Sequence, residues 1–67
     1  MDFITIYFTD TFDVNSIDIW TLNELFPTIE VSLGAGQYIN VYTIDRSIVD
    51  SIADELGRSN VLEIAYP

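Results

Sequence analysis

The sequence contains no cysteine, no histidine and no lysine. Without cysteine and histidine the chain cannot form disulfides, and it lacks the side chains that ordinarily hold zinc, haem or iron–sulfur clusters. Without lysine and histidine it also lacks the amine that forms Schiff bases and the commonest general base. We therefore expect no cofactor, no metal site and no catalytic residue, and we predict that the protein is not an enzyme.

Positive charge is almost as scarce as these side chains. Eleven aspartate and glutamate residues face two arginines, Arg46 and Arg58, which gives a formal net charge of −9 at pH 7. Because phosphate binding depends on lysine and arginine, we expect no direct binding to DNA, RNA or an anionic membrane surface. A cationic protein surface is the partner that this charge favours. The alternative interpretation is that the charge only keeps the protein in solution.

The chain is short, and 49% of its 67 residues are hydrophobic. We expect one domain over residues 1–67, and a domain of this size buries only about 60% of its unfolded surface. The apolar content is still too high for a disordered acidic tail. Since the N-terminus shows no basic leader and no apolar run reaches membrane-spanning length, we expect a cytoplasmic protein.

Four segments carry the β-branched and aromatic residues that are typical of strands. They are residues 3–8, 29–33, 38–44 and 61–66. Gly34-Ala35-Gly36 supplies a hairpin connection between the second and third of them. Both faces of the first segment are apolar or aromatic, which indicates a central strand.

Residues 17–26, which end at Pro27, are predicted to form a first helix. We expect Trp20 and either Leu25 or Phe26 to point into the core. One other interpretation remains open for the start of this segment. Residues 17–19 also fit a short strand, with the helix beginning only at a capping box of Thr21 and Glu24.

A second helix is predicted from an apolar stripe at helical spacing. The stripe consists of Ile48, Val49, Ile52, Ala53 and Leu56. Gly57 stands where a left-handed C-terminal cap belongs. Ser47 and Asp50 form a possible capping box at the start, and Asp45 is a competing N-cap.

The predicted order is therefore β-α-β-β-α-β, an α+β arrangement of the ferredoxin-like, split βαβ type. In this arrangement two helices cover one face of a four-stranded antiparallel sheet, and the first and third strands are central. The alternative, if the first helix is wrong, is a small β-rich sheet with one helix.

Alternation along the strands predicts which residues face the helices and which lie on the open face of the sheet. The residues expected to face the helices are Ile4, Ile6, Phe8, Ile39, Val41, Leu62 and Ile64. The residues expected on the open face are Phe3, Tyr7, Tyr38, Tyr42, Asn40, Glu30, Ser32 and Glu63. Aromatic rings beside carboxylates are typical of protein interfaces, so the four rings are candidates for partner binding. A homodimer through this face, or a second small core, is the alternative.

A second candidate surface is acidic. It comprises Asp10, Asp13, Asp18, Asp45, Asp50, Asp54 and Glu55. Asp10, Asp13, Asn15 and Asp18 could also bind a calcium ion weakly, but their spacing departs from the EF-hand pattern and helix capping explains them better. Asp50 and Asp54 are one helical turn apart and should share a face.

These features predict a small inhibitor that presents a DNA- or RNA-mimicking negative surface to a basic nucleic-acid-binding protein. In composition and size the chain resembles small phage-encoded inhibitors of host nucleic-acid enzymes, such as anti-restriction and anti-CRISPR proteins. That resemblance implies a phage or mobile-element origin and action in the cytoplasm of a host cell. The alternative function is a small structural or adaptor protein, or a homodimer, whose acidity serves solubility.

Overall fold

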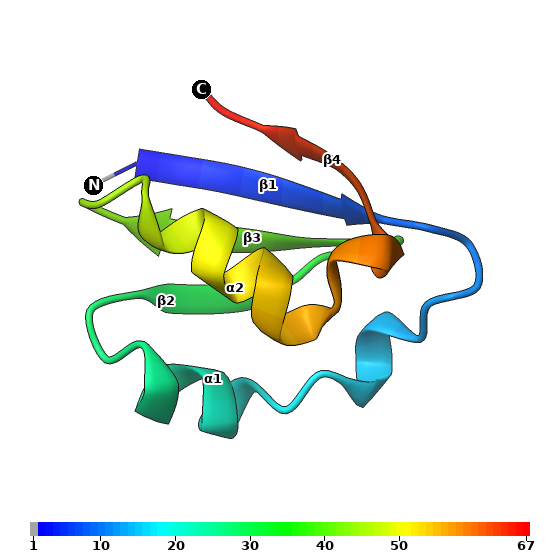
Figure 1. The fold of residues 1–67 in the computed structure, drawn as a ribbon, viewed down its shortest axis with the longest axis horizontal. Helices are drawn as coiled ribbons and strands as arrows, with labels where there is room; N and C mark the ends of the chain where they lie inside the picture. The colour runs from blue at the N-terminus through cyan, green and yellow to red at the C-terminus, as the bar shows by residue number, and fades with distance from the viewer. Residues whose placement is uncertain (1) are drawn as a thin grey trace.

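The computed structural model describes residues 2–67, and its strands and α-helices follow the predicted order (Figure 1). The strands are β1 (Asp2–Phe8), β2 (Glu30–Leu33), β3 (Tyr38–Thr43) and β4 (Val61–Ala65). The α-helices are α1 (Ile19–Leu25) and α2 (Ile48–Leu56). Two short 3₁₀ turns, η1 (Val14–Ser16) and η2 (Arg58–Asn60), precede α1 and β4.

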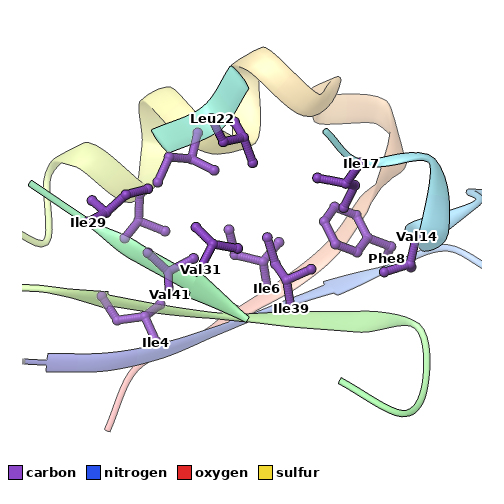
Figure 2. Packing of buried hydrophobic residues seen from close by; sticks show 12 residues of the cluster. Ile4, Ile6, Phe8, Val14, Ile17, Leu22, Ile29, Val31, Ile39 and Val41 are labelled. Atoms are coloured by element: carbon purple, nitrogen blue, oxygen red, sulfur yellow. The ribbon is translucent and has the colours of Figure 1, made fainter. Parts of the chain in front are cut away.

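The four strands form one antiparallel sheet in the order β2-β3-β1-β4. The first and third strands are central, as predicted, and β2 and β4 form the two edges. Both α-helices lie on the same side of this sheet (Figures 1 and 2). The ferredoxin-like prediction is therefore confirmed, and the alternative of a sheet with one helix is wrong.

The core lies between the sheet and the helices, as Figure 2 shows. The sheet contributes Ile4, Ile6 and Phe8 of β1 with Ile39 and Val41 of β3, all predicted to face the helices and all buried. The helix layer contributes Ile17, Leu22, Val49, Ile52 and Ala53. Because every second residue of the central strands enters this layer, their remaining residues are left on the open face.

The prediction for Leu62 is wrong, since this side chain is 72% exposed. The register of β4 against β1 shifts between Tyr7 and Phe8, because Glu63 pairs with Tyr7 but Val61 pairs with Phe8. Leu62 is the extra residue of this β-bulge, and a bulged residue leaves the regular alternation. Ile64 pairs with Ile6 beyond the bulge and packs against the core as predicted.

The first helix is shorter than predicted and is capped by Asp18. The Asp18 carboxylate accepts from the Thr21 backbone N–H at 3.2 Å and from the Thr21 hydroxyl at 2.7 Å. The helix therefore begins at Ile19, so neither the helix over residues 17–26 nor the Thr21/Glu24 capping box is correct. A short strand at residues 17–19 is also wrong.

One face of α1 packs against the sheet, and it differs from the predicted one. Leu22 faces the sheet and is buried, and residues two positions apart on a helix do not share a face. Trp20 is accordingly 70% exposed, so its predicted core position is wrong. Of the two alternatives predicted for the end of the helix, Leu25 is 51% exposed and is not a core residue. Phe26, the alternative to Leu25, does pack against the core.

The second helix follows its apolar stripe as predicted. Val49, Ile52 and Ala53 are buried, while Ile48 and Leu56 pack against the core. Gly57 ends the helix with φ 95° and ψ 104°, a positive-φ conformation that favours glycine but is not the αL well expected of the cap.

Ser47 stands at the N-cap position of α2 but forms no capping box with Asp50, and Asp45 caps the turn that leads into the helix. The Asp45 carboxylate accepts from the Ser47 backbone N–H at 3.0 Å and from the Ser47 hydroxyl at 2.6 Å. The Ser47 hydroxyl is thereby engaged with Asp45, and Ser47 has helical backbone angles and makes no side-chain cap bond. The predicted capping box is therefore wrong, and Asp45, the competing candidate, supplies the side-chain hydrogen bonds ahead of the helix, although it does not occupy the N-cap position itself.

Candidate interaction surfaces

The negative charge of the chain lies on the surface. Every acidic side chain from Asp10 to Glu63 is exposed. Two of these carboxylates are also held by hydrogen bonds that favour their ionised form. The Thr21 hydroxyl lowers the pKa of Asp18, and the Ser47 hydroxyl lowers the pKa of Asp45, each assisted by a backbone N–H. Both therefore stay ionised at neutral and mildly acidic pH.

Asp50 and Asp54 share an exposed face of α2, but an arginine joins them there. The Arg58 Nε donates to Asp54 Oδ1 at 3.1 Å, and the Arg58 Nη2 donates to Asp50 Oδ1 at 3.3 Å. These hydrogen bonds, first to Asp54 and then to Asp50, raise the pKa of Arg58. The three side chains together carry one net negative charge instead of two.

The seven acidic candidates do not form one patch. Asp10, Asp13 and Asp18 lie in the connection from β1 to α1, after the C-terminal end of β1 (Figure 1). Asp45 follows Thr43, which pairs with Asp2 at the opposite end of β1. Asp50, Asp54 and Glu55 lie on α2. The carboxylates therefore lie in separate groups, at both ends of the sheet and on its helix layer.

Helix capping, the interpretation favoured for the aspartates of the connection to α1, holds for two of them. Asp18 caps α1, and the Asp13 carboxylate accepts from the Asn15 backbone N–H at 3.0 Å, which makes it the cap of η1. Within residues 2–67 no group of three or more acidic side chains is placed to hold a metal ion.

The open face of the sheet brings together the four predicted rings in two pairs. Phe3 and Tyr42 meet edge to face with ring centroids 5.1 Å apart, and Tyr7 and Tyr38 are 5.8 Å apart. Between the pairs, the Thr5 hydroxyl donates to Asn40 Oδ1 at 3.1 Å. Phe3 is 43% exposed and Tyr7 38%, while Tyr38 and Tyr42 are half-buried, so part of each ring pair is open to solvent.

A carboxylate adjoins each ring pair. Glu30 of β2 is the register partner of Tyr42, and Glu63 of β4 is the register partner of Tyr7. Because β2 and β4 are the two edge strands, the two carboxylates stand at opposite edges of the open face. We call the four rings with these two carboxylates the aromatic sheet face.

The hairpin from β2 to β3 holds one of these rings in place. The Gly34 backbone N–H donates to the Tyr38 carbonyl at 3.2 Å, and the Tyr38 ring lies directly over Gly34. A Cβ atom at Gly34 would overlap that ring, whereas a Cβ at Gly36 would meet it at 3.5 Å, an ordinary contact. The glycine therefore supplies the space into which the tyrosine packs.

The structure adds two features that the sequence prediction missed. Arg58 bridges Asp50 and Asp54. The sequence does contain a signal for this contact, because Asp54 and Arg58 are four residues apart, the spacing of a helical ion pair. The Arg46 guanidinium lies over the Tyr66 ring, 5.2 Å from its centroid. Tyr66 follows β4, so no helical periodicity connects these two residues.

The described part of the chain has no detected pocket and no helix long and apolar enough to cross a membrane. No protein-family model, no curated protein and no solved structure matches the chain. The functional argument therefore rests on the two surfaces above.

Proposed function

We propose that the protein binds a cationic nucleic-acid-binding protein and thereby keeps DNA or RNA from that protein's binding surface. The observation that carries the proposal is the exposure of every acidic side chain from Asp10 to Glu63 in a chain with only two arginines. One of those arginines already bridges two carboxylates of α2. The surface thus has far more negative charge than this chain can neutralise.

Such a surface suits a cationic groove for two physical reasons. Carboxylates accept bidentate hydrogen bonds from arginine, as phosphates do. They can therefore bind the same arginine side chains of the partner that would otherwise bind the nucleic acid. The long-range field of a strongly charged molecule also raises the rate of encounter with an oppositely charged partner. The distribution of carboxylates around the whole fold favours steering from many directions, with the final contact made by a subset of them.

The partner would act in the cytoplasm. The gene for this protein would come from a phage or mobile element, because such an element benefits from inhibiting a nucleic-acid-binding protein of its host. Both statements are part of the proposal.

The first experiment is capture of the partner. The protein is immobilised, a nuclease-treated bacterial lysate is passed over it, and bound protein is eluted with a salt gradient and identified by mass spectrometry. The proposal expects a basic nucleic-acid-binding protein that leaves at moderate salt, because screening weakens contacts between exposed charges.

Charge variants connect that capture to the surface. The double variant Asp50→Asn/Asp54→Asn should release the partner at lower salt. The variant Ser51→Ala, on the exposed face of the same helix, should release it at the same salt concentration as the wild type. Ser51 is a suitable control because it is exposed and uncharged. Binding that salt and the double variant both leave unchanged would refute the proposal.

The adaptor or homodimer remains a second candidate because the aromatic sheet face is exposed. It predicts binding that salt does not release and that Tyr7→Ala or Tyr42→Ala abolishes, since apolar contacts are insensitive to ionic screening.

A further inference from the structure

The aromatic sheet face contains the same arrangement twice. The paired residues Thr5 and Asn40 mark the centre of the β1–β3 ladder, with Phe3 and Tyr38 two residues before them and Tyr7 and Tyr42 two residues after. A local two-fold axis through this centre exchanges β1 with β3, and Tyr7 with Tyr42. It also exchanges Glu63, the neighbour of Tyr7, with Glu30, the neighbour of Tyr42.

We propose that this face binds two arginine side chains of one partner, one at Tyr42 and Glu30 and the other at Tyr7 and Glu63. The inference rests on the proposed function, in which the partner is cationic, and it adds the face and the side chains that bind it. In each site the guanidinium lies over the tyrosine ring and its edge donates to the glutamate.

Both groups of a site suit a guanidinium. An arginine within about 6 Å of a ring centroid is attracted by the ring face, and its planar fork also matches a carboxylate. Lysine offers a point charge without the planar surface that stacks. This chain itself contains such a contact, since Arg46 lies 5.2 Å from the centroid of the Tyr66 ring.

The carboxylates of the two sites are available for a partner. No ion pair joins Glu30 or Glu63 to another residue of the described chain, and both side chains are exposed. Arg58 is held at α2, on the opposite side of the sheet. A cationic partner therefore supplies what this face lacks.

Charge also argues against other occupants of this face. A second copy would bring another molecule of formal charge −9 and two more glutamates against a face whose own glutamates form no ion pair with a described residue. A nucleic acid would bring phosphates against the same glutamates. An arginine-bearing protein segment is the occupant whose charge is complementary.

The spacing of the two sites defines the partner further. Tyr7 and Tyr42 are separated by four residues along the ladder and by one strand spacing, which places their Cα atoms about 14 Å apart. An extended segment with arginines four residues apart spans about 13 Å between them. The face thus fits a segment with arginines at positions i and i+4 in extended conformation.

The test uses the whole protein, labelled with ¹⁵N, and a blocked peptide with two arginines four residues apart among glycine and serine. Nuclear magnetic resonance should show the chemical-shift changes at backbone amides of β1 and β3, those of Tyr7 and Tyr42 among them. Replacing both arginines by lysine should weaken binding about two- to fivefold for each ring contact. Shifts confined to α2 and the connection before α1, or equal affinity for the lysine peptide, would overturn the inference.

Matched charge variants make the test specific. Glu30→Gln/Glu63→Gln should weaken the arginine peptide by roughly five- to tenfold, since each exposed ion pair contributes up to a few-fold. Glu24→Gln/Glu55→Gln removes the same charge from exposed positions of the helix layer and should change affinity less than about twofold. Equal losses in the two double variants would show that only total charge matters and would overturn the inference.

Three further outcomes separate this inference from the function on which it rests. Sedimentation that shows a dimer, lost in Tyr7→Ala, would assign the face to a second copy and overturn the arginine sites. If the variant Glu30→Gln/Glu63→Gln binds the captured cationic partner as tightly as the wild type does, the arginine sites are refuted. The proposed function is not affected by that result. Failure of nucleic acid to compete for that partner would instead refute the proposed function, whatever the peptide result.

Discussion

Arg58 Nε donates to Asp54 Oδ1 at 3.1 Å, across the C-terminal end of α2. One of only two cationic side chains in the sequence is thus held against the acidic helix. The position is favourable, because a positive charge near the last turn of a helix also interacts with its partial negative charge. The same contact reduces the negative potential of α2, so it opposes binding to a cationic partner.

Replacing Arg58 should therefore strengthen partner binding. Arg58→Gln is expected to raise the association rate at low salt, because one more net negative charge increases electrostatic steering. Stability should fall only slightly, since the ion pair is exposed. Stopped-flow association with the captured partner measures the rate. The double variant Arg58→Gln/Asp54→Asn restores the net charge and should return the rate to that of the wild type, and a double variant as fast as Arg58→Gln would contradict the argument.

Gly34→Ala should destabilise the fold, because the new Cβ would overlap the Tyr38 ring. Overpacking of this kind costs about 1–3 kcal/mol. Gly36→Ala is the matched control in the same hairpin, since its Cβ makes only an ordinary contact with that ring, and it should be close to neutral. Urea unfolding of both variants gives the comparison. Equal stability of the two variants would mean that the hairpin relaxes away from the ring without cost.

Salt should stabilise this protein at neutral pH. The molecule extends 29 × 25 × 21 Å, so at about 0.01 M salt the screening length of about 30 Å is as large as the molecule, and all its carboxylates repel one another. At about 0.15 M the screening length falls to about 8 Å and the repulsion is reduced. The urea midpoint should therefore rise over this range, and it should rise less in Glu24→Gln/Glu55→Gln. A midpoint that falls with salt would show that attractive surface pairs outweigh the repulsion.

The two capping aspartates should make stability depend on pH. The pKa values of Asp18 and Asp45 lie below the ordinary value of 3.8, so the folded state binds their protons less readily than the unfolded state. Their contribution is present above the unfolded pKa and is lost as the pH falls through the folded pKa. Asp18→Ala/Asp45→Ala should be less stable than the wild type near pH 7, and the difference should shrink below about pH 3.8.

Urea midpoints at several pH values test this dependence. Asp10→Ala is the control, because the Asp10 side chain makes no hydrogen bond to a described residue. It should not lose stability at any pH. A difference between the double variant and the wild type that persists undiminished at the acid end would contradict the role given to the ionised caps.

Much of the fold follows from short-range patterns in the sequence. Alternation in β1 and β3 predicts both the core and the aromatic sheet face, because a strand between two neighbours has no freedom to rotate its side chains to the other face. The apolar stripe of α2 predicts its buried residues for a similar reason. In each of these elements the hydrophobic residues repeat with a clear period, and the element packs against one defined layer of the fold.

The errors occur where one local contact shifts the phase of a pattern. The Asp18 cap begins α1 at Ile19, and several nearby residues were equally good caps by type alone. Leu22 rather than Trp20 faces the sheet, so Trp20 is left in solvent. The bulge at Leu62 depends on how β4 meets β1, which the residues of β4 alone do not encode. The acidic candidates are all exposed, but their division among both ends of the sheet and α2 follows from the topology.

The most direct test of the proposed function is competition between this protein and nucleic acid for the captured partner. A fluorescent duplex is bound to that partner, and the protein is added at increasing concentration while anisotropy is recorded. The account predicts that the duplex is fully displaced, that displacement weakens as salt rises, and that Asp50→Asn/Asp54→Asn requires more protein for the same effect. A ternary complex, in which the duplex stays bound while the protein also binds, would contradict it.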